Sequence, residues 1–351
     1  MKSLITSALI ATLVISGCGG GSEGIYGFTA PLQVVSFGDS LSDVGSYEVN
    51  GSPATGPLLF NGGRYTTNPG HVWTEIVAQR YGNTLTPAVR GGFGLAPFAA
   101  GGLGYAQGGA HVSEYVIQNY SSVLAQPVRR QVTDYLSSRG AFNSNQVILL
   151  NAGSNDIINA VLAAHNGALH PANVPGLVTQ AANDMGDELD RIVANGGKKI
   201  VLVNVSDIGA TPLAASSEDL SLDLSAMAAL FNDVLLGRVN SRPRPSELVL
   251  IDSYRWSGDM VANYRQNGFK VGNQDVACST NKILALARAK GLPFPESFIR
   301  ENGTALLCSA ATLTEPNADQ NFMFADALHP STRLHTLFAQ YVIQRLDARG
   351  F

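Results

Sequence analysis

Ser40 is a candidate nucleophile, because the sequence places it where a buried strand would end. It follows an apolar run at 34–37 and the pair Gly38-Asp39. A glycine allows the chain to leave a strand sharply, and a serine at that turn would lie beside the unpaired backbone N–H groups of a helix start. The same position also suits a serine that only caps a helix, so this segment alone leaves both interpretations open.

Asp326 and His329 supply a base together with a group that can orient it. The acid precedes the histidine by three positions, and Pro330 then breaks the chain. On a turn, this spacing lets the carboxylate hold the imidazole, which is the arrangement that activates a serine hydroxyl. None of the other histidines has an acid at this spacing followed by a proline. The chain also lacks an HExxH or Cys/His zinc pattern, so we expect neither a metal nor an organic cofactor.

Two further segments could donate hydrogen bonds to an oxyanion. Asn155 lies in the segment 153–156, directly after an apolar run, and its side-chain amide is one such donor. Gly108 and Gly109 lie in the glycine-rich segment 104–110, where no side chain would obstruct a backbone N–H. Helix capping and an ordinary glycine turn explain the same residues, so each segment is weak evidence by itself.

The spacing of apolar residues indicates which elements carry these side chains. Short runs rich in Val, Ile and Leu without alternation are typical of parallel strands covered on both faces. Such runs occur at 32–37, 146–152, 199–205 and 247–252, with a shorter candidate at 103–107. Helical patterns occur at 69–80, 124–138, 176–194, 225–240, 279–290 and 332–348. This alternation predicts an α/β fold with a five-stranded parallel sheet, whose ligands would bind at the carboxyl ends of the strands.

Taken in chain order, four segments resemble the sequence blocks of the GDSL family, also called SGNH hydrolases. They are FGDSLSD at 37–43, YAQGGA at 105–110, GSND at 153–156 and DALHP at 326–330. The resemblance implies a three-layer α/β/α sandwich with the flavodoxin-like strand order 2-1-3-4-5. It also implies an acyl-enzyme on Ser40, with His329 as the general base and Asp326 as the residue that orients it.

The resemblance further implies an oxyanion hole. Its donors would be the backbone N–H of Ser40, the backbone N–H of Gly109 and the side-chain amide of Asn155. The family has a single glycine at the second position, whereas this chain has both Gly108 and Gly109. We favour Gly109.

The N-terminus resembles the export signal of a bacterial lipoprotein. Lys2 precedes an apolar run at 4–15, which fits the core of a signal peptide and is too short to span a bilayer. Cys18 follows, and glycines and a serine come next. We therefore predict a signal peptide at 1–17, a lipid on Cys18 and a flexible tether at 18–30. Ordinary signal cleavage, with Cys18 incidental, is the alternative.

Residues 31–351 are expected to form one hydrolase domain, since no later linker, repeat or charge block divides them. Cys278 and Cys308 would pair as a disulfide in an oxidising compartment, and two buried thiols are the alternative. The net charge is −4 with scattered charges, which argues against a nucleic-acid partner. We expect a monomer in the cell envelope or outside the cell, whose partners are small-molecule or lipid esters. It would contact a membrane only through the lipid anchor.

Three functions compete for this chain. Ester hydrolysis is favoured, because a nucleophile, a base, its orienter and oxyanion donors are all present. Transfer of the acyl group to an alcohol other than water is the second, and a surface lipoprotein that only binds is the third. The glycine-rich segment 90–103 would either line an acyl pocket or form a mobile surface loop, and His111 could lie near the cleft.

Overall fold

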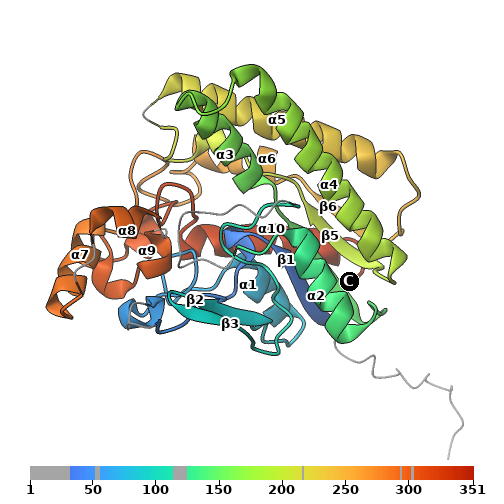
Figure 1. Ribbon diagram of the computed structural model, residues 1–351, viewed down its shortest axis with the longest axis horizontal. Helices are drawn as coiled ribbons and strands as arrows, with labels where there is room; N and C mark the ends of the chain where they lie inside the picture. The colour runs from blue at the N-terminus through green and yellow to red at the C-terminus, as the bar shows by residue number, and fades with distance from the viewer. Residues whose placement is uncertain (1–31, 52–55, 114–124, 216, 293–294, 302–303) are drawn as a thin grey trace, which may run out of the picture. The chain divides into compact units, whose positions relative to one another are not determined.

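Four of the apolar runs form a parallel sheet (Figure 1). The strands are β1 (Gln33–Gly38), β4 (Gln146–Asn151), β5 (Lys199–Val203) and β6 (Leu248–Ile251), which lie side by side in the order β1-β4-β5-β6. The register aligns Val35 with Ile148 and Ile148 with Ile200. All four strands therefore end at one edge of the sheet, where the polar segments of the sequence follow them.

This computed structural model describes residues 32–351 except 52–55, 114–124, 216, 293–294 and 302–303. The predicted signal peptide 1–17, the tether 18–30 and Cys18 lie outside the described residues. Residues from Pro31 to Phe351 belong to one compact unit.

The predicted count of five strands is wrong for this sheet. The segment 103–107 meets β1 through a single bridge between Ser36 and Gly104, outside the named strands. Gly104 also bridges to Pro87 on its other side, and a Cβ on Gly104 would lie 2.4 Å from the Val44 side chain. Gly104 thus occupies the fifth position of the sheet. The segment around it is too short and too closely packed to form a strand.

Ten helices surround the sheet in the part of the chain that the structure describes. They are α1 (Trp73–Arg80), α2 (Val128–Arg139), α3 (Ser154–His165), α4 (Val174–Ala194), α5 (Glu218–Asn240), α6 (Ser253–Ala262), α7 (Thr280–Ala289), α8 (Glu296–Glu301), α9 (Ala318–Asn321) and α10 (Thr332–Asp347). Helices α3 and α6 were absent from the sequence expectation, because each begins within three residues of a strand end and no loop separates the two patterns.

The two faces of the sheet bury alternate residues of each strand. Val35 and Ile148 pack with apolar side chains of α2, α3, α4 and α5. Val34 and Val147 pack on the opposite face with α1 and α10. This arrangement confirms the predicted three-layer α/β/α sandwich and explains why the strand sequences are apolar throughout.

Helix α5 has the length and hydropathy of a membrane span by composition alone. In the structure, Phe231 and Leu235 of this helix are buried in the core beside the sheet. The Asn232 side chain also binds the backbone N–H and carbonyl of Val205 at 2.8 Å each. In this fold α5 is therefore one of the helices that cover a face of the sheet.

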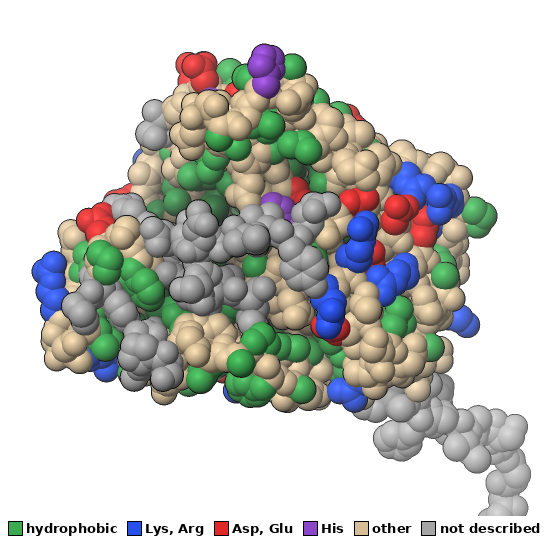
Figure 2. Space-filling view, viewed as in Figure 1, with side chains coloured by type: hydrophobic (Ala, Val, Ile, Leu, Met, Phe, Trp, Pro, Cys, Tyr) green, Lys and Arg blue, Asp and Glu red, His purple; other side chains and the backbone are tan. Residues whose placement is uncertain are grey.

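The glycine-rich segment 90–103 forms part of an antiparallel hairpin of β2 (Val89–Gly92) and β3 (Leu95–Ala99). Phe93 at its turn is buried beside Leu306, next to the helical group of α7, α8 and α9 (Figure 1). Figure 2 shows hydrophobic side chains gathered over the hairpin, where Phe98 is 49% exposed. The segment is therefore an ordered hairpin rather than a featureless loop.

Candidate active site

Ser40 stands at the carboxyl end of β1, where the chain leaves the sheet in a short 3-10 turn at Ser40–Ser42. Gly38 has a φ of +151°, and a Cβ there would lie 2.1 Å from the carbonyl oxygen of Asn151, so only glycine fits this exit. Gln131 of α2 holds the Gly38 peptide from both sides, accepting its N–H at 2.9 Å and donating to its carbonyl at 2.8 Å. The turn is therefore rigidly held beneath the Ser40 hydroxyl.

The structure brings Ser40, His329 and Asp326 together from opposite ends of the sequence. The Ser40 Oγ lies 2.9 Å from His329 Nε2, and His329 Nδ1 lies 2.8 and 3.0 Å from the two carboxylate oxygens of Asp326. When the Nδ1 proton points to the carboxylate, Nε2 accepts the Ser40 hydroxyl. All three residues are buried, so little water competes for these hydrogen bonds.

The Asp326 carboxylate is held in its charged form by its neighbours. It accepts the backbone N–H groups of Ala305 at 2.9 Å, Leu328 at 3.0 Å and His329 at 2.9 Å. Burial alone would raise the pKa of Asp326, but the His329 ring and these N–H donors outweigh burial and lower that pKa to about 2. Asp326 is therefore ionised at neutral pH and can orient the imidazole and stabilise its protonated form.

A disulfide lies directly behind this carboxylate. The structure joins Cys278 to Cys308 with a sequence separation of 30. The Cys278 N–H donates to the carbonyl of Ala325 at 2.9 Å, and Ala305, which binds Asp326, packs in the same cluster as both sulfurs. The disulfide thus joins two parts of the segment between β6 and α10, and a backbone hydrogen bond from each part reaches Ala325 or Asp326.

The tertiary structure distinguishes the two adjacent glycines. The N–H of Gly108 donates to the carboxylate of Asp43 at 2.9 Å, so Gly108 is engaged and is a poor donor to a substrate. A Cβ on Gly108 would also lie 2.2 Å from the Tyr65 ring. Gly109 follows with a φ of +79°, a conformation that favours glycine. The contact with Asp43 therefore argues against Gly108 as the second oxyanion donor.

Asn155 lies in the first turn of α3, next to the glycine segment. Its Nδ2 donates to the carbonyl of Ala110 at 2.9 Å, which uses one of its two amide hydrogens. In the same turn, the Asp156 carboxylate accepts the Val112 N–H at 3.2 Å. The start of α3 therefore holds the loop that follows Gly109 and leaves one Asn155 hydrogen for another acceptor.

His111 is buried in the loop that α3 holds. Asn159 Nδ2 lies 2.8 Å from its Nε2, and the Asp156 carboxylate lies 3.3 Å from its Nδ1. Its described hydrogen bonds thus run to α3 and not to Ser40 or His329. This geometry indicates that His111 positions the loop rather than transferring protons.

Sequence reasoning missed several side chains that hold the triad in place. The Tyr65 ring packs against the His329 ring with 4.8 Å between centroids, and the Thr66 hydroxyl donates to the carbonyl of Pro330 at 3.1 Å. The Asp43 carboxylate binds three backbone N–H groups and one hydroxyl between the Ser40 turn and Gly108. The segment 37–43 resembles the family's first block, but the pattern did not reveal these roles.

Asp39, next to the nucleophile, is a buried acid with an unusual environment. One of its oxygens accepts the Leu41 N–H at 3.0 Å, and the other has no hydrogen-bond partner among the described residues. Burial raises the pKa of Asp39 to about 7, although the Leu41 N–H and His329 act in the opposite direction. Folding therefore opposes ionisation of this side chain.

An Asp39→Asn variant should remove a stability cost that wild type incurs as the pH rises. The folded state keeps the Asp39 proton to about pH 7, whereas an unfolded aspartate loses it near pH 4. Wild type should therefore lose roughly 2–4 kcal/mol of stability between pH 4 and 8 through this group. Asparagine can still accept the Leu41 N–H but cannot ionise. Urea unfolding at both pH values measures the difference.

The exposed carboxylate of Asp223 gives a matched control for this measurement, since its side chain is 61% exposed. Asp223→Asn should leave the pH dependence of unfolding close to that of wild type. If Asp39→Asn keeps the wild-type slope between pH 4 and 8, the Asp39 side chain does not titrate as the structure indicates.

Among the residues that the structure describes, no three His, Cys, Asp or Glu side chains gather as a metal ion would require.

Known proteins resemble this chain over most of its length. A family model described as GDSL-like Lipase/Acylhydrolase matches residues 34–342. A phosphatidylcholine-sterol acyltransferase of Aeromonas hydrophila is 23% identical and covers 88% of each chain. A GDSL esterase/lipase of Arabidopsis thaliana is 25% identical over 92% of this chain and 89% of its own. Lipase 1 of Photorhabdus luminescens is 23% identical over 89% of this chain, which spans half of that protein.

Proposed function

The chain belongs to the GDSL-like lipase/acylhydrolase family, and we propose that it hydrolyses carboxylic esters through an acyl-enzyme on Ser40. The observation that carries this proposal is the 2.9 Å contact between Ser40 Oγ and His329 Nε2, with Asp326 bound behind the imidazole. Nucleophilic acyl transfer requires a serine that contacts a histidine, which in turn contacts an ionised aspartate.

The reaction follows from the positions of these groups. His329 Nε2 takes the Ser40 hydroxyl proton while Oγ attacks the ester carbonyl, and Asp326 stabilises the imidazolium that forms. The backbone N–H groups of Ser40 and Gly109 and the Asn155 amide would hold the oxyanion of the tetrahedral intermediate. His329 then protonates the leaving alcohol. Water attacks the acyl-enzyme by the same steps and releases the acid.

An Asn155→Ala variant should lower kcat by about 10²–10³ with little change in KM, because the lost donor acts mainly on charge in the transition state. Steady-state kinetics with p-nitrophenyl butyrate measure this. The Asn155 side chain also binds the loop at Ala110, so a control must separate the two roles. Asn159→Ala removes another α3 contact to the same loop, through His111, and should cost less than about tenfold. Equal losses in both variants would assign Asn155 to loop support alone.

A fluorophosphonate probe tests the proposed nucleophile in the unmodified protein. The probe should add one phosphonyl group to Ser40, found by peptide mass spectrometry, and should stop hydrolysis of p-nitrophenyl butyrate. Persistent hydrolysis without labelling of Ser40 would refute the proposal. If the protein shows neither labelling nor hydrolysis, the alternative of a surface lipoprotein that only binds would be favoured.

Acyl transfer is a second candidate, favoured by the similarity to a protein named phosphatidylcholine-sterol acyltransferase. The same acyl-enzyme would then pass its acyl group to an alcohol, and the outcome depends on how far the site excludes water. Product analysis with and without an added alcohol separates the two reactions. A new ester that grows with alcohol concentration supports transfer, whereas free acid as the only product refutes it.

We also propose that the protein is exported and held at the cell envelope by a lipid on Cys18, as the leader sequence suggests. On this proposal it works as a monomer on small-molecule or lipid esters, without a nucleic-acid partner. Cys18→Ala should move the protein from the membrane fraction to the soluble fraction. Unchanged membrane partitioning of Cys18→Ala would exclude the lipid anchor.

A further inference from the structure

A pocket lies at the carboxyl edge of the sheet, and the chain neighbours of Ser40 and His329 form part of its wall. Its wall includes Leu41, which follows the nucleophile, and Leu328 and Pro330, which flank His329. Asn151 and Val203 contribute from the ends of β4 and β5. Helices α1, α6 and α10 supply much of the remaining wall. The other lining residues come from the segments between helices and strands, and they are Ser206, Asp207, Thr211, Met323 and Phe324.

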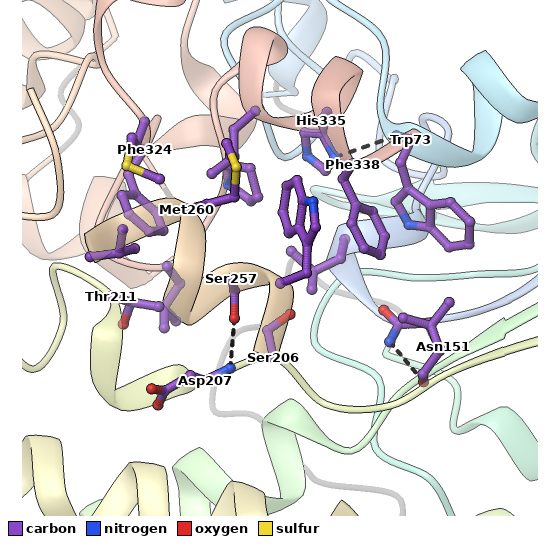
Figure 3. Close-up of a pocket in the computed structure, with 18 residues that line it drawn as sticks. Trp73, Asn151, Ser206, Asp207, Thr211, Ser257, Met260, Phe324, His335 and Phe338 are labelled. Atoms are coloured by element: carbon purple, nitrogen blue, oxygen red, sulfur yellow. Dashed lines mark hydrogen bonds between the residues drawn. The ribbon is translucent and has the colours of Figure 1, made fainter. Parts of the chain in front are cut away.

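The lining is dominated by large apolar side chains (Figure 3). Phe338 of α10 lies between two tryptophans, with ring centroids 5.4 Å from Trp73 and 4.9 Å from Trp256. Met260 and Val261 of α6 contribute aliphatic surface. A hydrocarbon chain would be removed from water on such a surface, which is favourable in proportion to the area buried.

Three polar side chains on the wall, Asn151, Thr211 and Ser257, are hydrogen-bonded within the protein. The Asn151 amide donates to the Val203 carbonyl, and the Thr211 hydroxyl donates to the Ile208 carbonyl. The Ser257 hydroxyl accepts the Asp207 N–H at 3.0 Å (Figure 3). A polar ligand would have to break these hydrogen bonds, whereas a hydrocarbon would leave them intact.

His335, the one histidine on this wall, does not make the pocket charged. Its Nδ1 accepts the Trp73 N–H at 3.3 Å (Figure 3). Burial is the largest effect on the ring and lowers the pKa of His335 to about 3. The imidazole is therefore neutral at the pH where the triad would work, and the lining remains suited to hydrocarbon.

We infer that this pocket receives the hydrocarbon chain of the acyl group that Ser40 takes up, so that the substrates are esters of fatty acids rather than acetyl esters. The inference rests on the proposed esterase function. The acyl chain stays attached to Ser40 while the alcohol must depart, and a pocket walled by the residues next to Ser40 and His329 suits the part that stays. The glycine-rich segment 90–103 contributes no residue to this wall.

A bulkier residue at Val261 should shorten the chain that the enzyme accepts. Val261 lies on the pocket wall and is only partly buried. Val261→Leu and Val261→Phe therefore increase the side-chain volume in two steps, and the smaller step, Val261→Leu, should leave the protein folded. Val261→Phe should lower kcat/KM for p-nitrophenyl octanoate by about tenfold or more, with Val261→Leu between it and wild type. Both should stay within about twofold of wild type on p-nitrophenyl acetate.

Leu236→Phe is the matched control. Leu236 is 46% exposed in a separate apolar groove between α5 and β6, and its enlargement should leave both activities unchanged. Wild-type rates that do not increase from acetate to octanoate would overturn the inference, as would an equal loss in Leu236→Phe. A loss on octyl acetate without a loss on octanoate would overturn it too, because the pocket would then hold the alcohol.

Tryptophan emission tests the pocket without turnover, because both tryptophans of the chain lie on its wall. Methyl decanoate should shift the emission of the Ser40→Ala protein in a saturable way, and methyl acetate should not. Val261→Phe in the same background should weaken the binding of methyl decanoate. If methyl decanoate binds while wild type hydrolyses no ester at all, the esterase proposal fails and the acyl assignment with it. If acetate esters are hydrolysed but methyl decanoate does not bind, only the pocket inference fails.

Discussion

Ser40→Ala should reduce the kcat for p-nitrophenyl butyrate by about 10⁴–10⁶, to the level that substrate binding and the oxyanion donors sustain without a nucleophile. Among the described contacts, only the Ser40 hydroxyl lies within hydrogen-bond distance of His329 Nε2, at 2.9 Å. It is therefore the group that His329 would deprotonate. Its loss removes one hydrogen bond at a buried site. We therefore expect a change of about 1–2 kcal/mol in the free energy of unfolding, measured by urea denaturation alongside the kinetics.

Ser36→Ala provides the matched control for this loss of activity. Ser36 lies on β1, four residues before the nucleophile, and its hydroxyl has no hydrogen-bond partner among the described residues. Removing it should leave kcat unchanged. If Ser40→Ala keeps more than about a hundredth of wild-type kcat while remaining folded, the acyl-enzyme cannot form at Ser40 and the proposed mechanism is wrong.

Asp326→Asn should lower kcat by about 10⁴. Both carboxylate oxygens of Asp326 accept backbone N–H groups as well as the His329 ring. The amide nitrogen of an asparagine would face a backbone N–H donor at either position. It would also donate to His329 Nδ1, which favours the tautomer with the proton on Nε2. Nε2 would then carry a proton and could not accept one from Ser40. Kinetics with p-nitrophenyl butyrate measure the loss.

The same substitution should also change stability in a defined pH window. Because the folded pKa of Asp326 is about 2 and lies below the ordinary value of 3.8, ionisation of this group stabilises wild type above about pH 4. That contribution, about 2 kcal/mol, is lost as the pH falls from 4 to 2. Asp326→Asn should lack it and should unfold with a smaller pH dependence in this range.

The surface pair of His165 and Asp223 provides a control for Asp326→Asn. His165 Nε2 lies 2.8 Å from the Asp223 carboxylate, and these side chains are 32% and 61% exposed. Asp223→Asn breaks a similar contact in a solvated position, where such pairs contribute little, and should change kcat by less than twofold. A kcat for Asp326→Asn within about tenfold of wild type would mean that His329 does not need this carboxylate.

Local sequence was sufficient where a single segment contains the whole signal. The runs 32–37 and 146–152 became β1 and β4 within one residue at most of their ends, because strands buried on both faces need apolar residues at every position. The pair Asp326 and His329 was readable because the two residues contact each other across a three-residue turn. The segment 103–107 was misjudged, since its strand character depended on neighbours at Pro87 and Val44 that no local pattern reveals.

The sequence by itself predicted the fold class and singled out Ser40, His329 and Asp326 as candidates for the nucleophile, the base and its orienter, because each depends on residue types within one short segment or on the order of such segments. Only the tertiary structure showed that the Gly108 N–H is engaged by Asp43, a residue 65 positions away. It alone also placed Trp73, Trp256 and Phe338 around one pocket beside Ser40. A pocket is a property of surfaces that meet from distant parts of the chain, and no local pattern of residues encodes its shape.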